Sequence, residues 1–222
     1  MVLTRLRGAS CLLSAVLVFP FPSAAFDTPL SDTAVREAYF MGQRHDETLP
    51  RFFDKYTKHL PPPKSGPYIS SIAFFTPFAL VAELSSQQAS GYSAQQAQID
   101  HRNRGESVKI IVQIEFTDSY GALIARPTSS GSGAPIGYAL RPYTFWKDFD
   151  VQVFDQEDPV KPFSNSAEPN YIWSEDGGCT LTGATLSFEF SPESFTTETA
   201  TVQITPPEGD IVRVDFDLSS FR

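Results

Sequence analysis

Hydrophobic and polar residues alternate strictly between Ser107 and Thr117. Val108, Ile110, Val112, Ile114 and Phe116 occupy every second position, and mainly polar residues lie between them. A period of two places all five apolar side chains on one face of a β-strand, whereas a helix would scatter them around its axis. One strand cannot bury such a face alone, so this segment predicts a sheet packed against a second layer.

The same rhythm recurs along the chain and predicts several further strands. They are expected at residues 68–76, 78–84, 122–125, 143–154, 171–173, 180–190, 200–205 and 211–218. A turn at 118–121 is expected to fold 122–125 back onto the strand at 108–116. The last two strands flank residues 206–210, which carry the Pro and Gly of a hairpin. The segments 85–92, 127–137 and 155–170 are polar or rich in Pro and Gly, which predicts loops.

Helices are expected mainly before these strands. Ser31 can cap a helix that ends near Gln43, and a second helix is expected from Thr48 to about residue 60. Ser93 and Gln96 have the spacing of a capping box, which predicts a short helix at about 93–104.

The pattern therefore predicts a fold that is mainly β with N-terminal helices. No helix is expected between the strands after residue 105, and parallel strands would need crossover helices. We expect an antiparallel immunoglobulin-like β-sandwich, with a partly open barrel as the alternative. The expected organisation is a signal peptide at 1–25, an N-terminal helical region at 26–66 and a β-sandwich domain at 67–222.

The first 25 residues have the pattern of a cleaved secretory leader. Arg5 and Arg7 precede an apolar run at 9–19, and small residues at 23–25 form a cleavage signal before Phe26. The apolar run is too short to span a bilayer comfortably. The expected location is periplasmic or secreted, with no transmembrane segment after cleavage.

Charge narrows the range of partners. The 222-residue chain has a formal net charge of −9, and loss of the leader, which holds two arginines and no acidic residue, makes it −11. Such a surface repels phosphate backbones, so no nucleic-acid partner is expected. Cleavage also leaves Cys179 as the single cysteine, which predicts no internal disulfide and favours a buried thiol on a strand.

Four aromatic residues are candidates for ligand binding. Tyr143, Trp146, Tyr171 and Trp173 lie on two expected strands that could be neighbours. Rings exposed on a sheet can stack on sugars or hold a peptide, whereas buried rings would only build the core. Trp146 has the opposite parity to Phe149, so we expect it to point outward if Phe149 points inward.

The densest acidic stretch is a candidate metal site. It comprises Asp148, Asp150, Asp155, Glu157 and Asp158. Clustered carboxylates suit a hard cation such as calcium, but the ordered spacing of a calcium loop is missing. A solvated acidic surface is the alternative, and no other cofactor is expected.

The sequence assigns no catalytic residue. His45, His59 and His101 are far apart, and no nucleophile elbow, phosphate loop or dinucleotide fingerprint occurs. A hydrolase would need one of these histidines to meet a carboxylate or a serine in a cleft.

Residues 34–43 (AVREAYFMGQ), with Pro77, Phe78 and residues 92–95 (YSAQ), resemble a set of uncharacterised exported bacterial proteins. The resemblance covers mainly residues 31–100, implies export and carries no activity. The leading hypothesis is a noncatalytic periplasmic or envelope β-sandwich that binds a protein partner or helps assembly. The alternatives are a carbohydrate or small-ligand binding module and a hydrolase with an unrecognised site.

Overall fold

The computed structural model describes residues 25–88, 91–120, 123–127, 136–173, 175, 177–207 and 209–222. The expected leader at 1–25 lies almost wholly outside these residues, as does most of the expected loop at 127–137. The helices are α1 (Asp32–Gly42), α2 (Thr48–Lys55), α3 (Pro77–Gln87) and α4 (Ala94–Arg104), with 3-10 turns η1 (Phe145–Asp148), η2 (Pro192–Ser194) and η3 (Leu218–Ser220). The strands are β1 (Thr57–His59), β2 (Pro67–Phe75), β3 (Val108–Phe116), β4 (Leu123–Pro127), β5 (Ile136–Leu140), β6 (Asp150–Asp155), β7 (Asp158–Val160), β8 (Ser164–Trp173), β9 (Cys179–Phe190), β10 (Thr199–Thr205) and β11 (Val212–Asp217).

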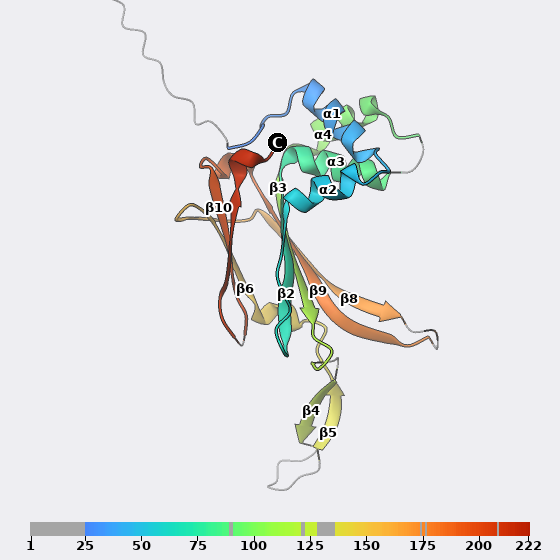
Figure 1. The fold of residues 1–222 in the computed structure, drawn as a ribbon, viewed down its shortest axis with the longest axis vertical. Helices are drawn as coiled ribbons and strands as arrows, with labels where there is room; N and C mark the ends of the chain where they lie inside the picture. The colour runs from blue at the N-terminus through green and yellow to red at the C-terminus, as the bar shows by residue number, and fades with distance from the viewer. Residues whose placement is uncertain are drawn as a thin grey trace, which may run out of the picture.

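Two antiparallel sheets form the body of the molecule. The larger has the order β1-β2-β3-β9-β8 and the smaller β11-β10-β6-β7, while β4 and β5 form a separate two-stranded sheet. Figure 1 shows the helices gathered over one end of the large sheet and the β4–β5 hairpin projecting from the other end. The predicted mainly β fold is confirmed, and its two sheets fit a β-sandwich.

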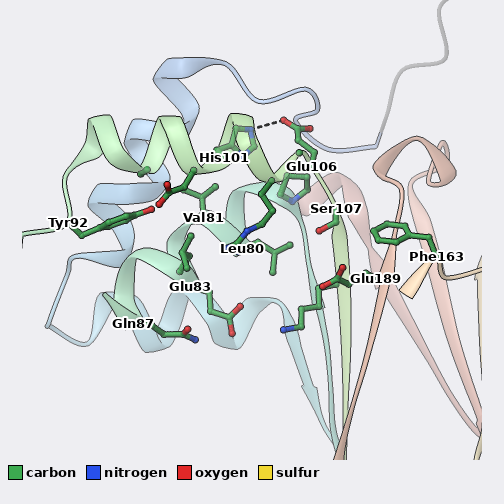
Figure 2. Close-up of a pocket in the computed structure, with 17 residues that line it drawn as sticks. Leu80, Val81, Glu83, Gln87, Tyr92, His101, Glu106, Ser107, Phe163 and Glu189 are labelled. Atoms are coloured by element: carbon green, nitrogen blue, oxygen red, sulfur yellow. Dashed lines mark hydrogen bonds and ion pairs between the residues drawn. The ribbon is translucent and has the colours of Figure 1, made fainter. Parts of the chain in front are cut away.

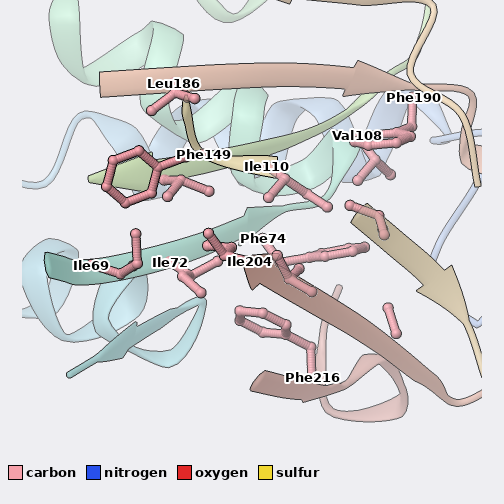
Figure 3. Close-up of a cluster of buried hydrophobic side chains, with 14 of the residues drawn as sticks. Ile69, Ile72, Phe74, Val108, Ile110, Phe149, Leu186, Phe190, Ile204 and Phe216 are labelled. Atoms are coloured by element: carbon pink, nitrogen blue, oxygen red, sulfur yellow. The ribbon is translucent and has the colours of Figure 1, made fainter. Parts of the chain in front are cut away.

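The core lies between the two sheets, as the alternation in β3 predicted. Val108 and Ile110 are both fully buried on the same face. From the smaller sheet, Ile204 and Phe216 pack into the same cluster, which also contains Phe74 of β2 (Figure 3). The expected hairpin of β10 and β11 is also confirmed, with Val202 opposite Val214.

The helices cover the other face of the large sheet along β1, β2 and β3. Ala73 and Phe75 of β2 are buried there with Tyr56 and Ala79, and Ile111 of β3 packs against them. Because successive residues of a strand face opposite ways, β2 contributes to two cores, which explains its nearly continuous apolar sequence. The helices α1, α3 and α4 bury a further small cluster among themselves.

Two helix starts follow the expected capping. The Ala34 amide donates to Ser31 Oγ at 3.1 Å, and the Gln96 amide donates to Ser93 Oγ at 3.1 Å. The Gln96 side chain bonds to Asp100 instead of returning to the cap, so the capping box is only half formed.

The expected strand at 78–84 is wrong, because these residues belong to α3. Thr76 is the N-cap and its Oγ1 accepts from the Ala79 amide at 3.3 Å, while Pro77 occupies the first helical turn. Proline suits that position because its missing N–H would have no partner there. Pro77 separates the two strands expected at 68–76 and 78–84, but in the structure it starts a helix that continues to Gln87.

The second expected helix is shorter than its apolar stripe. The helix α2 ends at Lys55, and residues 57–59 form β1 with Thr57 opposite Ala73. The helical region expected at 26–66 therefore contributes an edge strand to the large sheet.

Strand pairing and loops also differ from expectation. The strand β4 pairs with β5 instead of folding back onto β3. The expected loop at 155–170 holds β7 and most of β8, whose ten residues pair along β9. Because β8 is an edge strand exposed on both faces over most of its length, it carries no hydrophobic alternation that could reveal it.

Two further observations bear on the expectations. Within the part of the chain that the structure describes, no helix has both the length and the apolarity needed to cross a membrane. Cys179 is exposed, so the expectation of a buried thiol is wrong, although the residue does lie on a strand.

Candidate functional site

Tyr143 and Tyr171, two of the aromatic candidates, line one open depression of about 860 Å³. Tyr143 follows β5 and Tyr171 lies near the end of β8, so residues 28 positions apart in the sequence meet there. Both rings are exposed, at 61% and 42%, and Leu140 on the same rim is 76% exposed. We call this depression, with the neighbouring Ile172 and Trp173, the aromatic surface.

One arginine fixes the wall of the aromatic surface. The guanidinium of Arg141 lies 3.7 Å from the ring centroid of Tyr120 and donates to the Tyr120 hydroxyl at 2.7 Å. It also lies 5.6 Å from the ring centroid of Phe116 at the end of β3. These contacts hold the segment after β5, which leads into Tyr143, against the end of β3.

The other two aromatic candidates, Trp173 and Trp146, differ in exposure and packing. Trp173 is 73% exposed at the end of β8, beside Ile172, which is 64% exposed. Trp146 lies in the turn η1, packs partly against the main core and stands edge-on to Phe145. The expected strand over 143–149 is therefore wrong, and strand parity does not set the direction of Trp146.

The acidic candidates are not gathered into one metal site. Asp155 is buried, and its carboxylate accepts four hydrogen bonds from the amides and hydroxyls of Thr196 and Thr197. Asp148, Asp150, Glu157 and Asp158 are all exposed. Among the described residues, no group of three or more His, Cys, Asp or Glu side chains could hold a metal ion.

A second hollow lies between α3, α4 and the outer face of β3 and β9. This α3–α4 cleft has a volume of about 290 Å³. In Figure 2, Glu83 and Gln87 project from α3, His101 from α4 and Glu189 from β9. Apolar side chains, including Leu80 and Val81, form one wall, and charged side chains of both signs surround the rest.

Two groups in the cleft have shifted protonation equilibria. Burial raises the pKa of the Glu83 carboxyl, and the positive charge of Lys109 only partly opposes that shift. Burial also raises the pKa of Tyr92 to about 12, with a further contribution from the carboxylate of Asp100. Perturbed groups that line a cleft are a physical indication of a binding site.

At the edge of the cleft, His101 meets a carboxylate. Its Nε2 lies 3.1 Å from Glu106 Oε1, and both side chains are largely buried. Glu106 also accepts from the Leu30 amide at 2.6 Å and from the Thr28 hydroxyl. Ser107 lines the same cleft, but no hydrogen bond joins it to His101 in the described chain. Glu106 thus ties α4 to the segment before α1.

The remaining histidines form no comparable arrangement. His59 Nε2 lies 3.3 Å from Asp54 Oδ1 in an exposed pair, and His45 is exposed in the turn before α2.

No protein-family model matches the chain, and no curated protein matches it in sequence.

Sequence reasoning missed the residues of the α3–α4 cleft. Glu83 lies in a segment expected to be a strand, and Lys109 and Glu189 lie at polar positions of two expected strands, which carry no signal of a binding site. The available signal was the pair Thr76 and Pro77, which together predict a helix start.

Proposed function

We propose that this chain is a noncatalytic, exported binding module that holds an extended segment of a partner protein at its aromatic surface. The observation that carries the proposal is the exposure of Tyr171, Ile172 and Trp173, at 42%, 64% and 73%, at the end of an edge strand. Tyr171 and Trp173 share one face of the strand, because side chains two positions apart point the same way, and exposed apolar side chains on one face are typical of interaction sites in soluble proteins.

The edge of β8 gives the partner its backbone contacts. The strand order places β8 at the end of the large sheet, and among the described residues its ten residues pair only with β9. An extended segment can add to such an edge through main-chain hydrogen bonds, while pockets for alternate side chains provide specificity. The depression between Tyr143 and Tyr171 is one such pocket, because it lies beside the same strand.

The rest of the β8 edge limits indiscriminate pairing. Glu168 and Pro169 lie near its centre, and both residue types discourage the addition of a further strand. The favoured contact is therefore at the Tyr171–Trp173 end, where the aromatic side chains are.

Export is the second part of the proposal, and it is supported by the leader pattern at 1–25. Phe26, the first residue after the expected cleavage position, is buried in the main core. A chain that begins there keeps the buried residues of that core and loses the partly buried Ala25. The expected location is the periplasm or the cell exterior. The resemblance to exported bacterial proteins remains a prediction. So does an immunoglobulin-like order of the strands.

A random peptide display library tests the binding proposal. We expect selection on the wild-type protein to enrich segments with apolar or aromatic residues at every second position. Tyr143→Ser and Trp173→Ser should each weaken the binding of an enriched peptide by at least about ten-fold. The reason is that exposed aromatic side chains supply much of the binding energy at such sites.

The matched control is Phe40→Ser, which removes an aromatic ring that is 57% exposed on α1, outside the aromatic surface. It should leave peptide affinity unchanged. Failure to enrich any alternating peptide, or equal losses in Phe40→Ser and Trp173→Ser, would exclude the strand-addition proposal.

A carbohydrate ligand is the second candidate, because Tyr143 and Tyr171 line the same depression and tyrosine rings can stack on sugars. A glycan array probed with the same variants separates the two candidates. If the protein binds a glycan in a way that depends on Tyr143, and binds no peptide, the ligand of the aromatic surface is a sugar and not a protein segment.

A further inference from the structure

Four charged side chains of opposite sign line the α3–α4 cleft without pairing with one another. They are Glu83 on α3, Arg104 at the end of α4, Lys109 on β3 and Glu189 on β9. Among the ion pairs of the described residues, none involves any of these four. We propose that the cleft binds a small zwitterion of the α-amino acid class, with its ammonium group at Glu83 and Glu189 and its carboxylate at Lys109 and Arg104.

The sheet sets the position of two of these charges. Lys109 and Glu189 are direct partners in the β3–β9 register, and both face the helices on the outer side of the sheet. Side chains of a direct cross-strand pair lie close together, so a ligand resting on the sheet meets a positive and a negative group side by side. A ligand with both a positive and a negative group therefore matches this part of the sheet better than a simple amine or a simple acid.

Glu83 supplies the strongest reason for a bound cation. Its side chain is half-buried, and desolvation raises the pKa of its carboxyl group. No hydrogen bond to its carboxylate is present among the described residues, although its backbone oxygen accepts from the Ser86 hydroxyl. A half-buried carboxylate without a direct partner gains from an ammonium group that enters the cleft.

The other two carboxylates that line the cleft accept hydrogen bonds from the protein. Asp100 accepts from the Gln96 side chain at 2.7 Å, and Glu106 accepts from His101, Thr28 and Leu30. These bonds occupy part of their acceptor capacity, so we assign the charged groups of the ligand to the four side chains that have no such bond. The four side chains without such bonds carry two negative and two positive charges. This suits a ligand that has one charge of each sign and no net charge.

The size and lining of the cleft restrict the ligand further. A volume of about 290 Å³ is at the lower end of the range for small-molecule sites, which favours a single amino acid over a nucleotide or a peptide. Leu80, Val81 and Ala97 form an apolar wall, so an aliphatic side chain fits better than a charged one.

Titration calorimetry with a panel of apolar L-amino acids, up to about 10 mM, tests the proposal. For any amino acid that binds, two analogues remove one charge each. For leucine these are 4-methylpentanoate, which lacks the ammonium group, and 3-methylbutylamine, which lacks the carboxylate. Each analogue should bind at least about ten-fold more weakly, because each loses charge-assisted hydrogen bonds.

Two variants connect the binding to the cleft. Glu83→Gln and Lys109→Met keep side-chain size and should each weaken amino acid binding by about ten-fold or more. Glu115→Gln is the matched control, because Glu115 is exposed on the same face of β3, away from the cleft. Thermal unfolding of all three variants shows whether they are folded. If Glu83→Gln is unfolded, Lys109→Met and the two analogues still decide the result.

Three results would overturn the proposal. They are no binding of any apolar amino acid, equal binding of an analogue that lacks one charge, and unchanged affinity in both folded cleft variants. Since the aromatic surface uses different residues, Trp173→Ser should leave amino acid binding intact. Failure of either proposal is thus distinguishable from failure of the other.

Discussion

His101 Nε2 lies 3.1 Å from Glu106 Oε1, in a pair that is 12% and 16% exposed. His101 belongs to α4, and Glu106 lies between α4 and β3. Since the Glu106 carboxylate also accepts from the Leu30 amide at 2.6 Å, it joins the segment before α1 to the start of the central strand. One carboxylate therefore links the helices to the large sheet.

Glu106→Gln is expected to lower the free energy of unfolding by about 1–3 kcal/mol at pH 7, because charge-assisted hydrogen bonds are lost. Burial alone would raise the pKa of Glu106, but the hydrogen bonds from His101, Thr28 and the Leu30 amide outweigh it, and the pKa lies below its ordinary value of 4.5. A lowered pKa stabilises the folded state above pH 4.5, and that stabilisation is lost as pH falls through the folded pKa. Urea unfolding at pH 7 and pH 3 should therefore show a smaller effect of the substitution at pH 3.

Glu47→Gln is the control for this experiment. Glu47 forms an exposed pair with Arg51, which is expected to contribute less than about 1 kcal/mol. An effect of Glu106→Gln that is the same at both pH values would contradict a role for the ionised carboxylate.

Thr76→Ala should destabilise the protein by about 0.5–2 kcal/mol, because α3 loses its N-cap. Thr76 is fully buried, and its hydroxyl also donates to the backbone oxygen of Arg222. Thr76→Ser keeps the hydroxyl and should retain most of the stability. Chemical denaturation of both variants makes the comparison, and equal losses would assign the effect to the missing methyl group.

Gly42→Ala should weaken the packing of α1 against α3. A β-carbon at position 42 would lie 2.2 Å from the Ala82 carbonyl oxygen and 2.8 Å from Ser85 Cβ, so the two helices would have to separate. The expected cost is about 1–3 kcal/mol, measured as a lower midpoint of thermal unfolding. Thr33→Ala, at an exposed position of α1, should change stability by no more than about 0.5 kcal/mol. A neutral Gly42→Ala would show that the helices do not approach this closely.

Asp155→Ala should cost about 2–3 kcal/mol, because the donors of Thr196 and Thr197 lose a charged acceptor. Asp150→Ala, at an exposed position of the same strand, should have little effect. Calcium is expected to leave the unfolding midpoint of the wild-type protein unchanged, since both oxygens of Asp155 already accept hydrogen bonds. A midpoint that rises with calcium in the wild type, and not in Asp155→Ala, would instead support a calcium site.

The strands that are buried on one face could be predicted from the sequence. Val108 to Phe116 and the hairpin around residues 206–210 have the expected period, because burial of a single face imposes it. The strand β8 has no such constraint along most of its length, so its polar residues resembled a loop. Pro77 was ambiguous for another reason, since the same residue can interrupt a strand or start a helix, and the buried cap Thr76 resolves that choice.

The candidate sites depended even more on tertiary structure. Tyr143 and Tyr171 were recognised as aromatic candidates, but their shared depression depends on Arg141 packing over Tyr120. The charged residues of the α3–α4 cleft come from four separate elements. No local pattern places Glu83 beside Lys109, because that proximity arises only when α3 packs against the sheet.

The strands of the large sheet differ in how well they are covered, so their amide protons should exchange with solvent at different rates. The strand β3 has a neighbour on each side, a buried inner face and helices over its outer face, so its amide protons should exchange with solvent only when the whole domain unfolds. The strand β8 has one neighbour and mostly exposed side chains, and it can detach locally while the core persists. The slowest and fastest protons of one sheet are thus expected only two strands apart.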